Sequence, residues 1–352
     1  MKLKNKILSA RAIIKAKLFN KKIPLSVYLS LTDRCPTICA YCNVPQKKQK
    51  EISYEGIKDL IEDMSRMGTQ RLQLVGGEPM VRKDIGKIIN YAKEKDIFVT
   101  TSTSGYSISK RIDEIKNIDI IFLSFDGNRE IHDFQRGKGS FDNFLSAVES
   151  LKKNGIKFWT TTVLTEKNKT QLEYIYSMAE KYGFLTNFHL LYYFPENPEQ
   201  HFHPTKQPEN LIMNDKKIRE VLASLIKQKK DSAPIASSCS YFEYLQGWGD
   251  FTKMYADKTY NNVKCWAGQL YCYIDTGGMV YPCGDSIGRV KGYNVLDKGL
   301  KVAFNSLDEI PCKSCIVACN VEQNLMFSFN IKTIFNWLNN IKSKCPLLSV
   351  TL

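Results

Sequence analysis

Residues 24 to about 195 alternate short β-rich runs with amphipathic helical segments, which constrains the fold more than any other feature of the chain. One intervening helix is expected from an N-cap at Ser53 through Met67, with Ile57 and Leu60 on one face. Six such βα units predict parallel strands joined by right-handed crossovers. Their natural closure is an incomplete (β/α)6 barrel of the TIM type, in the α/β class. The strand-like runs lie near residues 26–32, 71–75, 97–103, 118–125, 157–163 and 186–192.

Three closely spaced cysteines follow the first run, in the segment Cys35-Pro-Thr-Ile-Cys39-Ala-Tyr-Cys42. Three thiolates at this spacing can hold three corners of a cubane iron–sulfur cluster, and the segment contains no fourth ligand. An iron without a protein ligand is open to a substrate or cofactor, as in catalytic metal sites. The alternative is a zinc ion with a distant fourth ligand.

Further polar motifs follow the next strand-like runs. They are Gly-Gly-Glu-Pro at residues 76–79, Thr-Ser-Gly at 103–105, and Ser-Phe-Asp-Gly at 124–127 with His132 and Arg136 behind it. The first of them would also suit an ordinary strand-to-helix turn. All lie at the predicted carboxyl ends of strands, where (β/α) barrels carry their chemistry.

In this order the motifs resemble those of radical S-adenosylmethionine (SAM) enzymes, over roughly residues 24–325. The resemblance implies that Cys35, Cys39 and Cys42 hold a [4Fe–4S] cluster whose open iron chelates SAM. One electron then cleaves SAM to methionine and a 5′-deoxyadenosyl radical, which abstracts a hydrogen atom from the substrate. The resemblance also implies SAM contacts from Tyr41, Gly76, Gly77, Glu78, Pro79, Ser104, Ser124, Asp126 and Arg136.

Most of these implied contacts have a physical rationale. The two glycines let backbone carbonyls approach the SAM ammonium group, and Glu78 supplies negative charge. Ser124 and Asp126 can hydrogen-bond the ribose, and Tyr41 can contact the adenine. Arg136 is placed to pair with the SAM carboxylate, which suits a guanidinium fork. The alternative for Arg136 is a surface loop charge.

A second group of cysteines lies toward the C-terminus. Residues 274–283 predict a β-hairpin that ends on Cys283, and a CxxC segment follows at 312–315. The pattern resembles the SPASM or twitch extension of radical SAM enzymes. It implies one auxiliary [4Fe–4S] cluster, because the second half of the SPASM pattern is incomplete. The implied ligands are Cys265, Cys283, Cys312 and Cys315, with Cys319 as their main rival. Zinc, or a second cluster that uses Cys272 and Cys345, is the alternative.

Cys239 lies outside both groups, in a segment expected to form a helix that faces the barrel mouth. Its thiol is a candidate hydrogen-atom donor to a substrate radical, although a free cysteine more often fills apolar space. We divide the chain into five parts. They are a basic amphipathic N-terminal helix (1–23), the radical SAM barrel (24–212), a helical bridge facing the substrate (213–260), a small cysteine-rich auxiliary-cluster domain (261–325) and a C-terminal amphipathic helix and tail (326–352).

The chain of 352 residues has a formal net charge of +14, much of it in an N-terminal stretch without acids. Apolar residues recur there at helical spacing, as in a helix that lies on an anionic membrane or closes the barrel bottom. Aromatic residues do not interleave with the basic ones, so no nucleic-acid partner is expected. No secretory signal or membrane span is expected, and the cysteines suit a reducing compartment. We therefore expect a cytoplasmic enzyme, with peripheral contact at the inner membrane face as an option. The apolar positions are Leu3, Ile7, Ala10, Ile14 and Leu18.

Three kinds of function are compatible with these motifs. Modification of a peptide or protein side chain is favoured, because it is the commonest task of SPASM-type relatives, although no precursor-binding winged-helix module is evident. A dehydrogenase or epimerase acting on a small-molecule or membrane-associated lipid substrate is the alternative. A non-catalytic iron–sulfur or zinc scaffold is disfavoured, because a scaffold needs no SAM pocket. The expected partners are the substrate and a reductant such as flavodoxin or ferredoxin.

Overall fold

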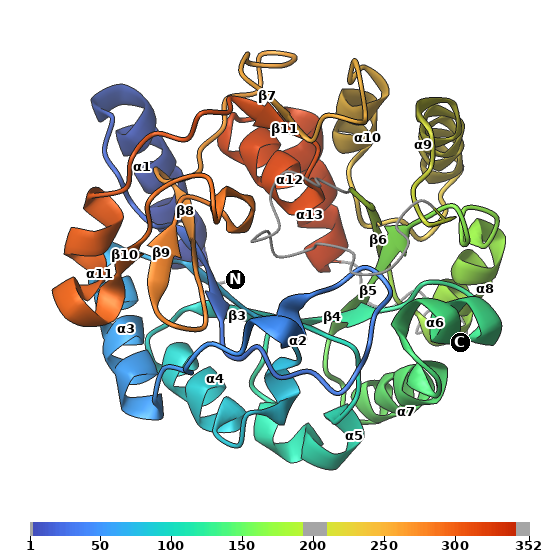
Figure 1. Cartoon of the computed structure of the whole chain (residues 1–352), viewed down its shortest axis with the longest axis horizontal. Coiled ribbons are helices and arrows are strands. Elements are labelled where there is room, and N and C mark those ends of the chain that lie inside the picture. The colour runs from blue at the N-terminus through green and yellow to red at the C-terminus, as the bar shows by residue number, and fades with distance from the viewer. Residues whose placement is uncertain (1–2, 193–209, 343–352) are drawn as a thin grey trace.

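The structure is a computed structural model that describes residues 3–192 and 210–342. Six parallel strands, neighbours in chain order, form its central curved sheet (Figure 1). Five fall within predicted strand-like runs and β5 extends one residue past its run, which confirms the partial (β/α)6 barrel. The strands are β1 (Ser26–Ser30), β2 (Arg71–Val75), β3 (Phe98–Thr103), β4 (Ile120–Ser124), β5 (Phe158–Leu164) and β6 (Thr186–Leu190).

Helices cover the outside of this sheet. They are α3 (Tyr54–Met67), α4 (Ile85–Glu94), α5 (Ile108–Arg111), α6 (Arg129–Arg136), α7 (Ser140–Lys153) and α8 (Leu172–Tyr182). The predicted N-cap of α3 is confirmed, since the Ser53 hydroxyl oxygen accepts a hydrogen bond from the Gly56 N–H at 3.2 Å. Gly68 ends the same helix with a φ of +88°, a conformation that glycine adopts without strain.

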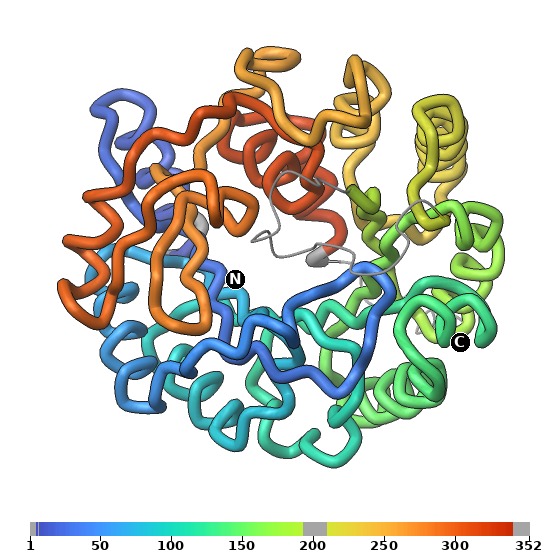
Figure 2. The backbone as a smooth tube through the Cα atoms, in the orientation of Figure 1, coloured from blue at the N-terminus to red at the C-terminus, as the bar shows by residue number. Residues whose placement is uncertain are grey.

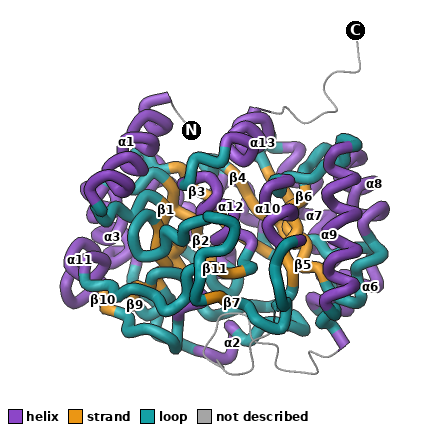
Figure 3. The backbone as a smooth tube through the Cα atoms, turned by 90° about the horizontal axis from the view of Figure 1, so that it is seen from above, coloured by secondary structure: helices purple, strands orange, loops and turns teal. Residues whose placement is uncertain are grey.

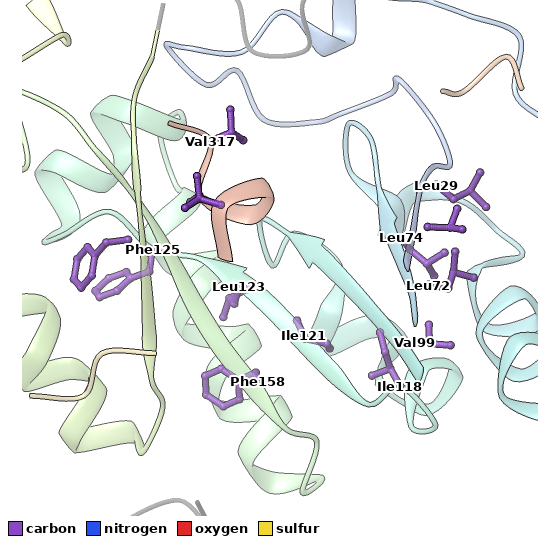
Figure 4. Packing of buried hydrophobic residues seen from close by; sticks show 14 of the residues in the cluster. Leu29, Leu72, Leu74, Val99, Ile118, Ile121, Leu123, Phe125, Phe158 and Val317 are labelled. Carbon is purple, nitrogen blue, oxygen red and sulfur yellow. The ribbon is translucent and has the colours of Figure 1, made fainter. Parts of the chain in front are cut away.

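Alternate residues of the strands form the hydrophobic core between sheet and helices. Leu29, Leu72, Leu74 and Leu123 are buried there and are among the residues drawn in Figure 4. The other set of alternate residues faces the interior of the barrel. The strand residues that line the candidate site are therefore those that alternate with the buried apolar ones.

The C-terminal third continues the barrel sheet. Strand β8 (Tyr271–Ile274) pairs in parallel with β1, and β9 (Met279–Tyr281) returns antiparallel to it, which confirms the predicted hairpin. Strand β10 (Tyr293–Asn294) extends this edge and leads into α11 (Val295–Asn305). A separate small sheet joins β7 (Tyr255–Ala256) to β11 (Ser314–Cys315).

Four more helices stand on the side of the barrel that the six strands leave open (Figure 1). They are α9 (Asp215–Lys230), α10 (Cys239–Gln246), α12 (Ala318–Phe327) and α13 (Ile331–Lys342). Before α10 the chain runs parallel to β6, where Ile235 bridges Thr186. At the amino ends of the strands, Trp337 of α13 lies 5.6 Å from Trp159 of β5, ring centre to ring centre. The open side is thus filled by helices.

Helix α1 (Leu3–Phe19) lies against the barrel through the face opposite its predicted apolar stripe. The predicted apolar stripe is turned to solvent, with Ile7 50%, Ile14 45% and Leu18 71% exposed. Ala12 and Ala16 instead pack on a cluster that includes Trp266, because small side chains allow a close approach. None of the helices in the described residues is long and apolar enough to cross a bilayer.

Leu74→Ala tests the core beneath the site. Leu74 is fully buried, so the substitution should lower the free energy of unfolding by about 2–5 kcal/mol. Leu296→Ala is the matched control, because Leu296 is 51% exposed and loses far less contact. Urea unfolding followed by circular dichroism measures both variants, and equal losses would contradict the assignment of the core.

Candidate functional site

The loop that carries Cys35, Cys39 and Cys42 leaves β1 and crosses the face of the barrel before α2 (Val44–Lys47) (Figure 2). The hydroxyl oxygen of Thr37 lies 3.0 Å from the sulfur of Cys35 and 3.9 Å from that of Cys39. The Cys42 N–H donates to the Cys39 carbonyl at 3.3 Å, a turn that returns the third thiol toward the others. Burial raises the pKa of all three thiols, that of Cys42 to about 12, and the neighbouring thiols raise the pKa of Cys42 further.

This donor set fits a cubane cluster. Across the described residues, no three Cys, His, Asp or Glu side chains converge closely enough to hold a single metal ion. A cubane spreads its thiolates over different irons, so its ligands lie farther apart than those of one ion. Three thiols on one loop, each near enough to affect the ionisation of another, suit such a cluster with one open iron.

The Gly-Gly-Glu-Pro turn packs directly against the cysteine loop. The Gly77 N–H donates to the Thr32 carbonyl at 2.7 Å, and the Glu78 N–H donates to the Arg34 carbonyl at 2.9 Å. A Cβ atom on Gly76 would lie 2.4 Å from the Thr32 oxygen, and one on Gly77 would lie 2.4 Å from the Arg34 oxygen. Glycine is required here because two stretches of backbone touch.

Glu78 and Ser104 are engaged with each other. The Glu78 carboxylate is fully buried and accepts hydrogen bonds from the Thr103 hydroxyl at 2.6 Å and the Ser104 N–H at 2.8 Å. The Ser104 hydroxyl donates to the same carboxylate at 2.5 Å. Both side chains are predicted to contact SAM, and that role stays a prediction. The Glu78 carboxylate joins the β2 turn to the end of β3, and buried Pro79 after it starts a short 3-10 helix (Pro79–Val81).

Asp126 and Arg136 form a buried ion pair beside the cysteine loop. Arg136 Nε lies 2.6 Å from Asp126 Oδ2, and the Tyr41 hydroxyl donates to the same oxygen at 3.0 Å. Asp126 Oδ1 accepts the Val163 N–H at 2.9 Å. Burial opposes ionisation of Asp126, but the Arg136 charge outweighs it and holds the pKa of that carboxyl below its usual value. The Arg136 guanidinium also acts on the Cys39 thiol, so it lies between the pair and the loop.

These contacts give Asp126 a structural role. Its carboxylate accepts four hydrogen bonds and positions Arg136 and Tyr41, while its ribose contact stays a prediction. Ser124 is half-buried at the end of β4, and its neighbour Leu123 lies in the core. Its side chain therefore faces the barrel interior, as the ribose contact requires.

The sequence motifs did not indicate His189 on β6 or Asp285 in the segment after β9. Phe188 and Leu190 lie in the core, so His189 between them faces the interior. Burial lowers the pKa of His189 to about 4, and its ring has no hydrogen-bond partner among residues 3–192 and 210–342. The Tyr192 hydroxyl donates to buried Asp285 at 3.1 Å. Strand alternation alone would have placed His189 inward.

Four members of the second cysteine group lie near one another, and their role as cluster ligands stays a prediction. Burial raises the pKa of Cys265, Cys283 and Cys315, and thiols of the same group, Cys312 included, raise it further. Arg289 Nη1 lies 3.6 Å from the sulfur of Cys312. These four thiols come from the segments around β8, β9 and β11. They are close enough to affect one another's ionisation.

Cys319 faces elsewhere. It packs with Tyr28 of β1, and burial followed by the charge of Asp285 raises its pKa to about 12. The Gln323 side-chain N–H donates to the Tyr28 hydroxyl at 2.6 Å and to the Cys319 carbonyl at 3.2 Å. The structure thus separates Cys319, on the barrel side of α12, from the four-thiol group.

The other cysteines lie apart from both groups. Cys272 is fully buried in the core on β8, and Cys345 lies outside the described residues. Cys239 starts α10 and affects the pKa of Lys229 on α9. A hollow of about 620 Å³ lies under α1, lined by Arg11, Lys15 and Glu94 among others, and contains none of the motif residues.

Gly77→Ala tests the contact between the turn and the cysteine loop. The added Cβ would meet backbone oxygens at 2.4 and 2.7 Å, so the loop must move. We expect the variant to fold but to bind about four fewer irons after reconstitution, because three ligands of one cluster are displaced. Gly249→Ala is the control, since no atom lies within 4 Å of its added Cβ. Full iron content in Gly77→Ala would contradict this account.

Comparisons with known proteins agree with this geometry. Residues 29–179 match the model of the Radical SAM superfamily. The mycofactocin maturase MftC of Mycolicibacterium smegmatis is 28% identical over 286 residues, which cover 78% of this chain and 68% of the relative. The Fe-coproporphyrin III synthase of Methanosarcina barkeri is 31% identical over 49% of this chain, a match that spans 46% of that relative.

Solved structures share the fold. SuiB of Streptococcus suis, with S-adenosylmethionine bound, superposes with a TM-score of 0.64 at 15% identity, over 83% of this chain and 68% of SuiB. The enzyme anSMEcpe, with AdoMet bound, gives a TM-score of 0.61 at 16% identity, over 89% of this chain and 99% of its own. Residues 29–179 therefore form a radical SAM domain, and the chain is an enzyme of this kind with a SPASM- or twitch-like C-terminal extension, whose cofactors are SAM and a [4Fe–4S] cluster.

Proposed function

We propose that this enzyme modifies a side chain of a peptide or protein by radical chemistry. The observation that carries the proposal is the similarity to a mycofactocin maturase across 78% of the chain. A second support is the fold shared with SuiB, whose solved structures include one with the precursor peptide SuiA. The enzyme anSMEcpe has likewise been solved with a peptide.

A small-molecule substrate is the second candidate, as for a radical dehydrogenase or epimerase. Its support is the 31% identity to the Fe-coproporphyrin III synthase. That match covers 49% of the chain, whereas the maturase match covers 78%. The peptide substrate is therefore preferred.

Cys35, Cys39 and Cys42 are proposed as the ligands of the SAM-cleaving cluster. When bound, that cluster and SAM supply a 5′-deoxyadenosyl radical that abstracts a hydrogen atom from the substrate. The chain's own task is to hold the three thiols in place, and the hydrogen bonds from Gly77 and Glu78 to the loop do so.

Arg136 is proposed to pair with the SAM carboxylate. It lies between Asp126 and Cys39, so its charge stands beside the cysteine loop. Asp126 fixes the guanidinium through two nitrogens, which reduces the freedom that would be lost on binding an anion. Ser124 is the proposed ribose contact. Tyr41 stays the proposed adenine contact, with its ring centre 5.6 Å from the Arg136 guanidinium carbon.

The part of the barrel interior near His189 and the Tyr192–Asp285 pair is proposed to receive the substrate. His189 offers a neutral imidazole that can donate or accept a hydrogen bond. The Tyr192–Asp285 pair lies near the second thiol group, since Asp285 raises the pKa of Cys283 and Cys315. A substrate held here would lie between the two thiol groups.

Cys265, Cys283, Cys312 and Cys315 are proposed to hold one auxiliary [4Fe–4S] cluster. Electron exchange with the substrate radical, or support of the extension, is its proposed task. We further propose flavodoxin or ferredoxin as the reductant, and the cytoplasm as the location, because clusters held by thiolates suit a reducing compartment. The role of Cys239 as a hydrogen-atom donor stays a prediction.

Iron and sulfide analysis tests the two ligand sets. After anaerobic reconstitution the enzyme should contain about eight irons, four for each cluster. Cys312→Ala should reduce this to about four, because the auxiliary cluster loses a ligand. Cys319→Ala is the matched control and should keep about eight, since its thiol faces β1. About four irons in Cys319→Ala would overturn the assignment.

Reductive cleavage of SAM tests the function itself. With dithionite and SAM, the wild type should release 5′-deoxyadenosine, and Cys42→Ala should release none, because the cluster has lost a ligand. Candidate peptides labelled with deuterium should then pass deuterium into 5′-deoxyadenosine, as read by mass spectrometry. Deuterium transfer from a labelled small molecule, with none from any peptide, would favour the second candidate.

A further inference from the structure

The outer face of helix α1 exposes large apolar side chains. The helix is fixed to the barrel from the other side, where Ala12, Ile13 and Ala16 are buried and the Asn5 side chain donates to the Asp96 carbonyl at 2.7 Å. The helix therefore cannot turn its outer face inward without losing this packing. Its exposed residues are Ile7 (50%), Leu8 (38%), Ile14 (45%), Leu18 (71%) and Phe19 (67%).

A second exposed apolar group lies beside it, at the start of α13. Phe329 is 41% exposed, Ile331 68% and Phe335 60%. The Lys17 ammonium of α1 stands 4.0 Å from the centre of the Phe329 ring, so the two groups adjoin. Figure 3 shows α1 and α13 at the same end of the molecule. We call these eight apolar residues, together with Arg11, Lys15, Lys17 and Lys21, the apolar–basic face.

The charge on this face has one sign. Residues 1–32 and 323–352 contain no Asp or Glu. Arg11, Lys15, Lys17 and Lys21 are exposed on or after α1, and among the described residues none of them forms an ion pair. Two acids, Glu94 and Asp96, line the hollow beside α1, and Arg11 and Lys15 border the same hollow. The Arg11, Lys15, Lys17 and Lys21 side chains are nevertheless exposed, so an external anion can reach them.

We propose that the apolar–basic face seats the enzyme on the surface of an anionic lipid bilayer. Large apolar side chains exposed together on one face mark an interaction site. A bilayer surface accepts apolar side chains below its headgroups and cations at its phosphates, so it satisfies both features at once. A second copy of the chain would bring like charges together. A bound nucleic acid could pair with the cations but would leave the apolar side chains of Leu18, Ile14 and Ile331 exposed to water.

The direction of docking follows from the fold. Helix α2, which directly follows the cysteine loop, and strand β9 lie at the end opposite α1 and α13 (Figure 3). A docked enzyme would therefore open its barrel toward the aqueous side. Docking in this way would concentrate the enzyme near membrane-associated partners. It would not bring lipid to the barrel mouth, which faces away from the bilayer. The inference stands apart from the proposed function, because binding to a membrane requires no turnover.

Vesicle co-sedimentation of the reconstituted enzyme tests the proposal. Vesicles of phosphatidylcholine with about one quarter phosphatidylglycerol should pellet the enzyme, and pure phosphatidylcholine vesicles should pellet far less. Raising the salt from about 0.1 M to about 1 M should weaken binding several-fold, because the screening length falls from about 10 Å to about 3 Å. Equal pelleting with both vesicle types would overturn the proposal.

Paired variants locate the contact. Leu18→Ser with Phe19→Ser should reduce vesicle binding by about tenfold or more, because two apolar anchors are removed. Leu296→Ser with Val302→Ser is the matched control on α11, where both residues are 51% exposed, and should bind as the wild type does. Rates of SAM cleavage should be unchanged in both pairs. If the wild type self-associates and only Leu18→Ser with Phe19→Ser abolishes this, the face binds a second copy of the chain. That outcome would refute the proposal of membrane binding.

Discussion

Two backbone hydrogen bonds, from Gly77 to Thr32 and from Glu78 to Arg34, join the cysteine loop at the mouth of this barrel to the sheet below it. The cysteine loop has little regular structure between β1 and α2, so it cannot hold its own shape. Its shape comes from contact with the β2 turn, where the backbones are too close for any side chain on Gly76 or Gly77. Glu78 then fixes that turn to the end of β3 through buried hydrogen bonds. The loop is therefore as rigid as the parallel sheet below it.

The far side of the loop depends on a buried ion pair. Asp126 and Arg136 are both largely desolvated, and each compensates the other's charge. Removing one partner from such a pair typically costs about 3–5 kcal/mol, since the other is left uncompensated. The Ala40 N–H also donates to the Gln135 carbonyl at 2.9 Å, which joins the loop to α6. The three thiols are thus supported from β2 on one side and from α6 on the other.

The cysteine-rich extension is continuous with the barrel. Because β8 pairs in parallel with β1, the hairpin that bears Cys283 is an outward continuation of the same sheet. Asp285 follows it, contacting Tyr192 near β6 and Asn320 on α12. The interior is consequently enclosed by residues from both ends of the chain. This arrangement gives the proposed substrate region one wall from the barrel and one from the extension.

Local patterns in the sequence were sufficient for the strands, the cap at Ser53 and the placing of each motif at a strand end. Periodicity and turn chemistry act over a few residues, so they can be recognised without the fold. The partners of buried polar groups are different, because they come from distant segments. Glu78 pairs with Ser104, and Tyr28 with Gln323, across 26 and 295 residues respectively.

The sequence by itself determined a (β/α)6 barrel, two cysteine groups and the order of the motifs. Only the tertiary structure decided that Glu78 and Asp126 position their neighbours, that Cys319 faces β1, and that α1 turns its apolar stripe outward. A helix with apolar residues on both sides has no preferred face until a surface selects one. The Trp266 cluster accepted the side that carries Ala12, Ile13 and Ala16, where two small side chains allow a close approach.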